Sequence, residues 1–98
     1  MAKRKMIWSV RAQIKLSDIL QFYAERNGSK GYSNKLYLKI SKSIRLLEKY
    51  PEIGHKTEFD FIRGLIVDSF IIFYEIRDKE IIIHTIWDCK QNPDKLKV

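Results

Sequence analysis

Apolar positions in the first part of the chain recur at steps of three and four residues. Between Val10 and Asn27 this spacing predicts a helix that buries one face. Its apolar stripe consists of Ala12, Leu16, Ile19, Leu20 and Tyr23. Ser9 is suited to cap the start of this helix, and Gly28 to end it, because glycine readily adopts the left-handed conformation past a helix end.

A second segment with the same spacing runs from Ser29, which can cap it, to about Tyr50. Its apolar positions are Leu36, Tyr37, Ile40, Ile44 and Leu47. Pro51 ends this helix, because the residue before a proline avoids helical geometry. The short connection between the two segments predicts a helical hairpin.

After Pro51 the pattern changes to the alternation of strands. Three strands are predicted, over Phe59–Val67, Phe70–Arg77 and Ile81–Trp87, and tight turns between them favour antiparallel neighbours. A short strand over Lys5–Ser9 precedes the first helix. The order predicts an α+β fold, β-α-α-β-β-β, in which the two-helix hairpin packs on a mostly antiparallel four-stranded sheet.

Strict alternation divides the side chains of each strand between two faces. Arg63 falls on the side of Leu65, whereas Glu75 and Arg77 share one side of the next strand. The last strand is divided into Ile81, Ile83, Thr85 and Trp87 on one side and Ile82, His84 and Ile86 on the other. Whether His84 shares the face of Glu75 depends on strand register, which the sequence leaves open.

Length and composition narrow the class of protein. A chain of 98 residues with 45% apolar residues predicts one globular domain over residues 1–98. The one cysteine, Cys89, has no internal partner, and no run is long enough for a signal peptide or a membrane span, so we expect a cytoplasmic location. The scattered His55, His84 and Cys89 do not form a zinc motif, and no nucleotide-binding fingerprint is present. We therefore expect neither a metal nor a cofactor.

The net charge indicates the kind of partner that the protein binds, and it does not bear on the fold. The chain carries a formal charge of +7 at pH 7. Such a charge favours partners rich in phosphate, such as RNA or a ribonucleoprotein, and equally an acidic protein.

Arg63 is the sharpest candidate for a functional side chain, because a guanidinium in the middle of an apolar strand needs an acidic partner, carbonyls or a ligand phosphate. Two interpretations remain open. The planar fork can recognise a phosphate or a carboxylate of a ligand, or it can form a structural ion pair with Glu75 or Asp60.

A second group of candidates lies on the last two strands. His84 can act as a general acid or base near neutral pH, and Glu75 can exchange a proton or pair with an arginine. Structural roles remain open for both. His55 and Lys56 precede the Arg63 strand in a connection, and such connections often supply binding groups.

Several short motifs, in this order and spacing, resemble the RelE/ParE superfamily of bacterial toxins from type II toxin–antitoxin modules. The matching stretches are Leu46–Gly54, Ile62–Leu65, Phe73–Ile76, Ile81–Ile83 and the tail Asp88–Pro93. The resemblance covers nearly the whole chain. It implies a growth-inhibiting toxin of the plasmid-stabilisation type, neutralised by an acidic or amphipathic segment of a cognate antitoxin.

The superfamily contains two mechanisms, and the resemblance extends to both. RelE-like members cut mRNA on the ribosome, which implies Arg63, His84 and Glu75 as catalytic residues here. The residues that would bind RNA phosphates are Arg63, Arg77, Lys56, His55 and Lys90. ParE-like members inhibit DNA gyrase without cleaving RNA, and a degenerate member would bind only its antitoxin. Ribosome-dependent mRNA cleavage is the leading expectation, although residues 88–98 contain neither the aromatic residue nor the histidine that such nucleases often carry there.

Overall fold

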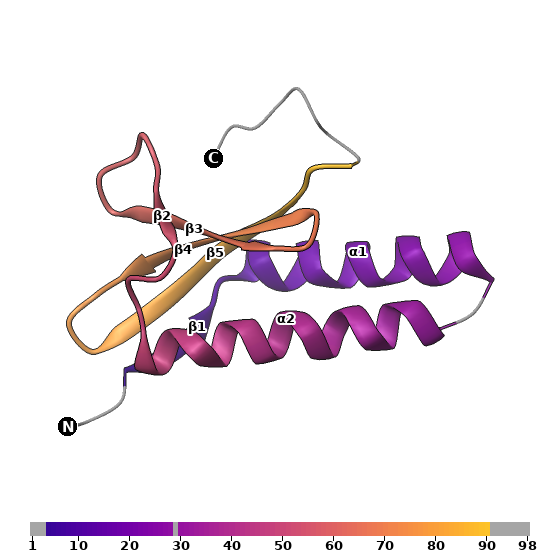
Figure 1. The fold of residues 1–98 in the computed structure, drawn as a ribbon, viewed down its shortest axis with the longest axis horizontal. Coiled ribbons are helices and arrows are strands. Elements are labelled where there is room, and N and C mark those ends of the chain that lie inside the picture. Colours follow the sequence, from indigo (N-terminus) through magenta and orange to yellow (C-terminus); the bar gives the residue numbers. More distant parts are fainter. Residues whose placement is uncertain (1–3, 29, 91–98) are drawn as a thin grey trace.

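A computed structural model of the chain describes residues 4–28 and 30–90. Its elements follow the order β1 (Lys5–Trp8), α1 (Val10–Asn27), α2 (Gly31–Lys49), β2 (His55–Lys56), β3 (Ile62–Val67), β4 (Phe70–Ile76) and β5 (Glu80–Asp88). The strands form one sheet in the order β1-β5-β4-β3-β2, in which β1 runs parallel to β5 and the other pairs are antiparallel. The two helices lie together on one side of this sheet (Figure 1). The predicted α+β architecture is therefore confirmed.

The first helix has the bounds that its sequence predicts. The Ser9 hydroxyl accepts a hydrogen bond from the Ala12 amide at 3.0 Å, and Gly28 ends the helix in the left-handed conformation with φ of 67°. The second helix begins at Gly31 after Lys30, which makes no capping bond through its side chain. The predicted cap, Ser29, lies outside the described residues. Neither helix in the described ranges is long and apolar enough to cross a membrane.

The core lies between the helices and the covered face of the sheet. Its largest fully buried side chains are Tyr74, Phe70, Ile40, Leu47, Ile72, Ile81, Ile83 and Ile86. The core also contains a buried polar pair near the end of β5, where the Tyr23 hydroxyl donates to Asp88 Oδ2 at 2.9 Å. Burial and this carboxylate raise the pKa of Tyr23 to about 12, so the hydroxyl keeps its proton and the hydrogen bond persists at neutral pH.

The sheet has five strands in the described part of the chain, one more than the sequence predicts. The added strand is β2, whose two residues pair with β3 in the register His55↔Gly64 and Lys56↔Arg63. Two residues are too few to produce a recognisable alternation, so the sequence suggests only a connection there. The next strand starts at Ile62 rather than Phe59, because residues 57–61 form a turn that Thr57 holds together.

A β-bulge corrects the predicted faces of the last strand. Phe73 pairs with Thr85 and Tyr74 with Ile83, so His84 is an extra residue opposite one step of β4. The bulge reverses the alternation beyond this point, and Ile86 joins the core whereas Thr85 and Trp87 turn to the other face. The predicted grouping of Ile81 and Ile83 with Thr85 and Trp87 is therefore wrong.

Candidate functional site

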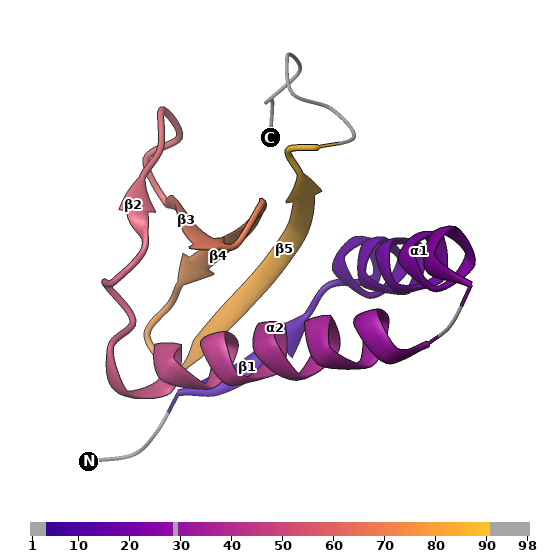
Figure 2. The ribbon, with the colours of Figure 1, turned by 45° about the vertical axis from the view of Figure 1, so that its right-hand side comes forward.

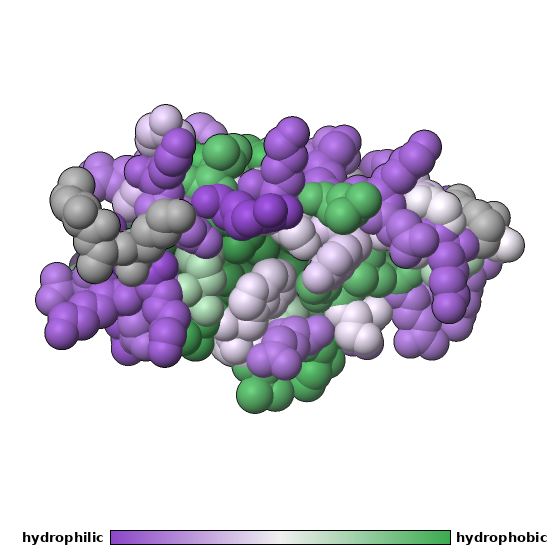
Figure 3. Space-filling model, turned by 90° about the horizontal axis from the view of Figure 1, so that it is seen from below, coloured by the Kyte–Doolittle hydropathy of each residue, from purple (hydrophilic) through white to green (hydrophobic). Residues whose placement is uncertain are grey.

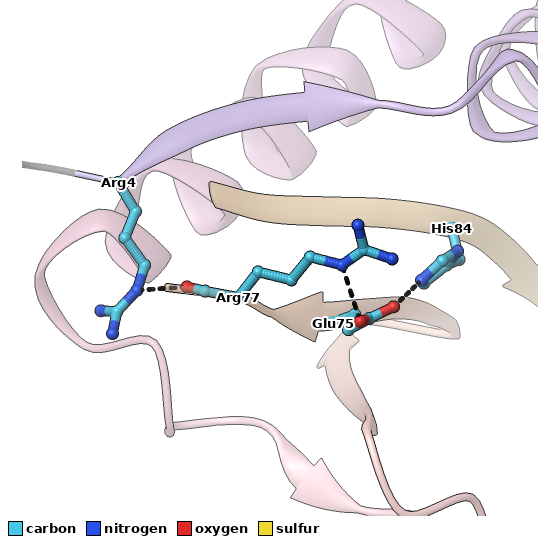
Figure 4. Close-up of polar contacts among 4 residues, drawn as sticks. All are labelled: Arg4, Glu75, Arg77 and His84. Carbon is cyan, nitrogen blue, oxygen red and sulfur yellow. Dashed lines mark hydrogen bonds and ion pairs between the residues drawn. The ribbon is translucent and has the colours of Figure 1, made fainter. Parts of the chain in front are cut away.

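Three polar side chains meet on the sheet face that the helices leave open. Glu75 Oε1 lies 2.9 Å from His84 Nε2, and its other oxygen, Oε2, lies 2.8 Å from Arg77 Nε. The register Glu75↔Ile82 places Ile82, and with it His84 two residues farther on, on this face, which answers the question of register that the sequence leaves open. Figure 4 shows the Glu75 carboxylate between the Arg77 guanidinium and the His84 ring, with Arg4 bonded to the Arg77 carbonyl at 2.8 Å.

Hydrogen bonds to the Glu75 carboxylate favour its ionised form. Hydrogen bonds from Arg77 and then from His84 lower the pKa of Glu75 below its usual range. An ionised carboxylate accepts hydrogen bonds and donates none, so the hydrogen between it and His84 belongs to Nε2. In the neutral imidazole the acceptor is then Nδ1. The His84 side chain is 33% exposed, against 18% for Glu75, so solvent reaches the histidine more readily than its partner.

Arg63 lies away from this cluster, on the covered side of the sheet. Its register partner on β4 is Tyr74, whereas Glu75 follows on the opposite face. The guanidinium donates through Nη1 to the carbonyl oxygens of Gly54 at 2.9 Å and Glu52 at 3.3 Å. The described residues form no ion pair with Arg63, so its structural partners are backbone carbonyls rather than an acidic side chain.

The segment that Arg63 contacts is also held by Tyr74. The buried Tyr74 hydroxyl donates to the Pro51 carbonyl at 2.6 Å and accepts from the Gly54 amide at 2.9 Å. A Cβ on Gly54 would come within 2.5 Å of the tyrosine oxygen, so only glycine permits this approach. Burial raises the pKa of Tyr74, which keeps the donating proton in place. Sequence reasoning missed this role, although Pro51 and Gly54 ahead of a buried tyrosine strand are its visible signal.

The remaining predicted residues are distributed over the molecule. Lys56 is the register partner of Arg63 on β2, and its neighbour His55 pairs with Gly64 on the open face. Lys90 is exposed beyond the end of β5, where its backbone amide donates to Asp88. The structure therefore brings together Glu75, Arg77 and His84, and separates them from the other predicted residues.

Two hollows on the surface are lined mainly by apolar side chains. One, of about 360 Å³, lies on the open face and includes Phe59, Gly64, Ile66, Ile71 and Phe73 in its lining. The other, of about 500 Å³, lies between β1 and the helices and includes Met6, Trp8, Leu16, Leu20 and Ile44. Among residues 4–28 and 30–90 no group of three or more histidine, cysteine or acidic side chains is arranged to hold a metal ion.

One comparison with known proteins identifies a family. Residues 6–93 match the family model described as the ParE toxin of the type II toxin–antitoxin system parDE. No curated protein matches the chain.

Solved structures share the fold. A chain of a chromosomal ParDE toxin–antitoxin system from P. aeruginosa superposes with a TM-score of 0.76 and 22% identity, over 86% of this chain and 94% of that one. A chain of the DinJ–YafQ toxin–antitoxin complex from E. coli gives 0.60 and 11%, over 93% and 98%.

Proposed function

This chain belongs to the ParE toxin family and is the toxin component of a type II toxin–antitoxin module with a cognate antitoxin, and we propose that it stops growth in the cytoplasm by binding DNA gyrase rather than by cutting RNA. The resemblance to the ParE-like branch supplies the identity of this target. The geometry supplies the argument against cleavage.

The observation that carries this proposal is the separation of Arg63 from Glu75 and His84. Cleavage of RNA at the ribose 2′-hydroxyl needs a cation at the phosphate and a proton-transfer group within hydrogen-bond reach of the same nucleotide. Here Arg63 lies on the covered side of the sheet and bonds to carbonyls, whereas the histidine and the carboxylate lie on the open face. The three residues expected to form a catalytic site therefore do not lie on one face of the sheet.

The state of Glu75 adds a second argument. A carboxylate with a lowered pKa binds a proton weakly, and a general base works best when its pKa lies near the operating pH. Both carboxylate oxygens are also occupied, one by Arg77 and one by His84. Glu75 is better suited to holding its neighbours in place than to moving a proton.

Ribosome-dependent mRNA cleavage stays as a second candidate because of one specific feature. Glu75 orients His84 so that Nδ1 is the acceptor of the neutral ring, as a carboxylate orients the base in many hydrolases. In this candidate His84 is the base, and Arg77 supplies the positive charge beside it with the guanidinium nitrogens that Glu75 does not contact. Arg63, Lys56, His55 and Lys90 would contact the RNA only beyond the reacting nucleotide.

We also propose which surface of the toxin contacts the antitoxin. The hollow between β1 and the helices has an apolar lining that also includes Arg45, and β1 is one of the two edge strands of the sheet. Seen from the side of α2, apolar patches are exposed between polar side chains (Figure 3). The apolar face of an acidic amphipathic segment would bury this lining, and its charge would complement the net charge of +7. We assign the hollow to the antitoxin.

Induction of the toxin without its antitoxin separates the two mechanisms. We expect Glu75→Gln and His84→Ala to leave growth arrest and gyrase inhibition intact, with mRNA uncut in translating extracts. Arg11→Ala, at an exposed arginine of α1 outside the cluster, serves as the matched control. Loss of arrest in His84→Ala, together with wild-type cleavage of mRNA that this variant abolishes, would establish the nuclease instead.

A further inference from the structure

Within the described part of the chain, the loop between β2 and β3 stands away from the two helices, beyond the sheet, in both ribbon views (Figures 1 and 2). Its residues are Thr57, Glu58, Phe59, Asp60 and Phe61, which we call the tip loop. The loop has a defined shape, because the Thr57 hydroxyl donates to the Ile62 carbonyl at 2.8 Å and accepts from the Phe59 amide at 3.1 Å. A loop held in this way loses little conformational freedom when it binds a partner.

The tip loop presents aromatic side chains to solvent. Phe61 is 76% exposed and Phe59 is 43% exposed, whereas the other phenylalanines of the sheet, Phe70 and Phe73, are buried. Phe59 also borders the hollow on the open face, next to Ile66, which is 59% exposed. Exposed aromatic side chains beside a continuous apolar surface are characteristic of protein-binding sites.

The charge of the tip loop identifies the class of partner. Glu58 and Asp60 alternate with the two phenylalanines, and residues 57–61 include no basic residue. Lys56 and Arg63 flank the loop and line a small hollow together with Asp60 and Phe61. Two carboxylates at the tip repel the phosphates of a nucleic acid, and they repel an acidic antitoxin segment for the same reason. The complementary partner is a protein surface with an apolar pocket and a rim of lysine or arginine side chains.

We propose that the tip loop is the contact through which the toxin holds its protein target, with Phe61 inserted into an apolar pocket and Glu58 and Asp60 facing basic side chains at its rim. Phe59, Ile66 and the hollow on the open face extend this contact along the sheet. The inference rests on the proposed function only in requiring that the target be a protein, and it holds whether or not that protein is gyrase.

The test compares Phe61→Ser and the charge reversal Glu58→Lys/Asp60→Lys with the wild type. The matched control is Val10→Ser, which removes a side chain of similar exposure, 71%, from the start of α1. Three quantities are measured: the induction level that stops growth, the toxin concentration that half-inhibits gyrase supercoiling, and the affinity for the purified antitoxin. All of the altered side chains are exposed, and thermal unfolding checks that each variant keeps the wild-type fold.

We expect Phe61→Ser to weaken growth arrest and gyrase inhibition about thirtyfold, as truncation of a central aromatic contact does, with unchanged antitoxin affinity and an unaffected control. The charge reversal should weaken both activities in the same direction. A wild-type toxin that stops growth but spares gyrase would disprove the gyrase target alone, and loss of arrest in Phe61→Ser would still support the tip-loop contact. Undiminished arrest in both variants, a parallel loss of antitoxin affinity, or a wild type without toxicity would overturn it.

Discussion

Single side chains determine how the segment between α2 and β2 is held. The Tyr74 hydroxyl bonds two backbone groups of residues 51 and 54, and Arg63 bonds the carbonyls of residues 52 and 54. The sequence predicts that a guanidinium within an apolar strand needs partners, since an unpaired one is costly. It leaves open whether these partners are an acidic side chain, carbonyls or a ligand phosphate, because the segment that supplies the carbonyls has no periodic pattern to place it beside β3.

Replacing Tyr74 tests this anchor. Tyr74→Phe keeps the ring in the core and removes both hydrogen bonds, which leaves the Gly54 amide and the Pro51 carbonyl without their partner. We expect the free energy of unfolding to fall by about 1–3 kcal/mol, the cost of leaving buried polar groups unsatisfied. Denaturant titration of the wild type and the variant measures the difference, and equal midpoints would show that water replaces the hydroxyl without loss.

The Glu75 carboxylate predicts a pH dependence of stability. Its folded pKa is lowered relative to the unfolded chain, where a glutamate titrates near about 4.3. Its contribution is therefore present above the unfolded value and is lost as the pH falls through the folded pKa. We expect Glu75→Gln to destabilise the protein at pH 7 and to show a shallower loss of stability than the wild type below about pH 4. Parallel acid titrations of the two proteins would contradict this assignment.

At the scale of elements, the helices follow from the sequence more closely than the strands do. Ser9 and Gly28 mark the ends of α1 through local chemistry that acts within one turn of the chain. The bulge at His84 is a property of the pairing between β4 and β5, and no residue type in the sequence indicates it. The register of β5 against β4 is likewise set by pairing and not by residue type, so the sequence could name His84 and Glu75 as candidates but could not place them on one face.

The Ser9 cap is expected to stabilise both α1 and its contact with β5. Besides accepting from the Ala12 amide, the Ser9 hydroxyl donates to the His84 carbonyl at 2.8 Å, so it joins the helix to the bulged strand. We expect Ser9→Ala to lower the free energy of unfolding by about 1–2 kcal/mol, in the upper part of the range for a lost cap. Ser17→Ala, at an exposed position of the same helix, is the matched control and should be nearly neutral. A similar effect of the two substitutions would show that the cap contributes nothing of its own.

Across the whole molecule, two surfaces of different character face in different directions. The helix side carries an apolar hollow at the edge strand β1, and the opposite side carries the tip loop and the open face of the sheet. The order of elements and the short motifs were enough to predict the fold and the toxin family from the sequence. The choice of target was not predictable in this way, because it depends on which side chains share a face.

A supercoiling assay with purified gyrase and wild-type toxin decides whether gyrase is the target. We expect the toxin to block supercoiling, its purified antitoxin to restore it, and mRNA on translating ribosomes to stay intact at the same toxin concentration. Unimpaired supercoiling together with cleaved mRNA would show that the toxin is a nuclease and not a gyrase inhibitor.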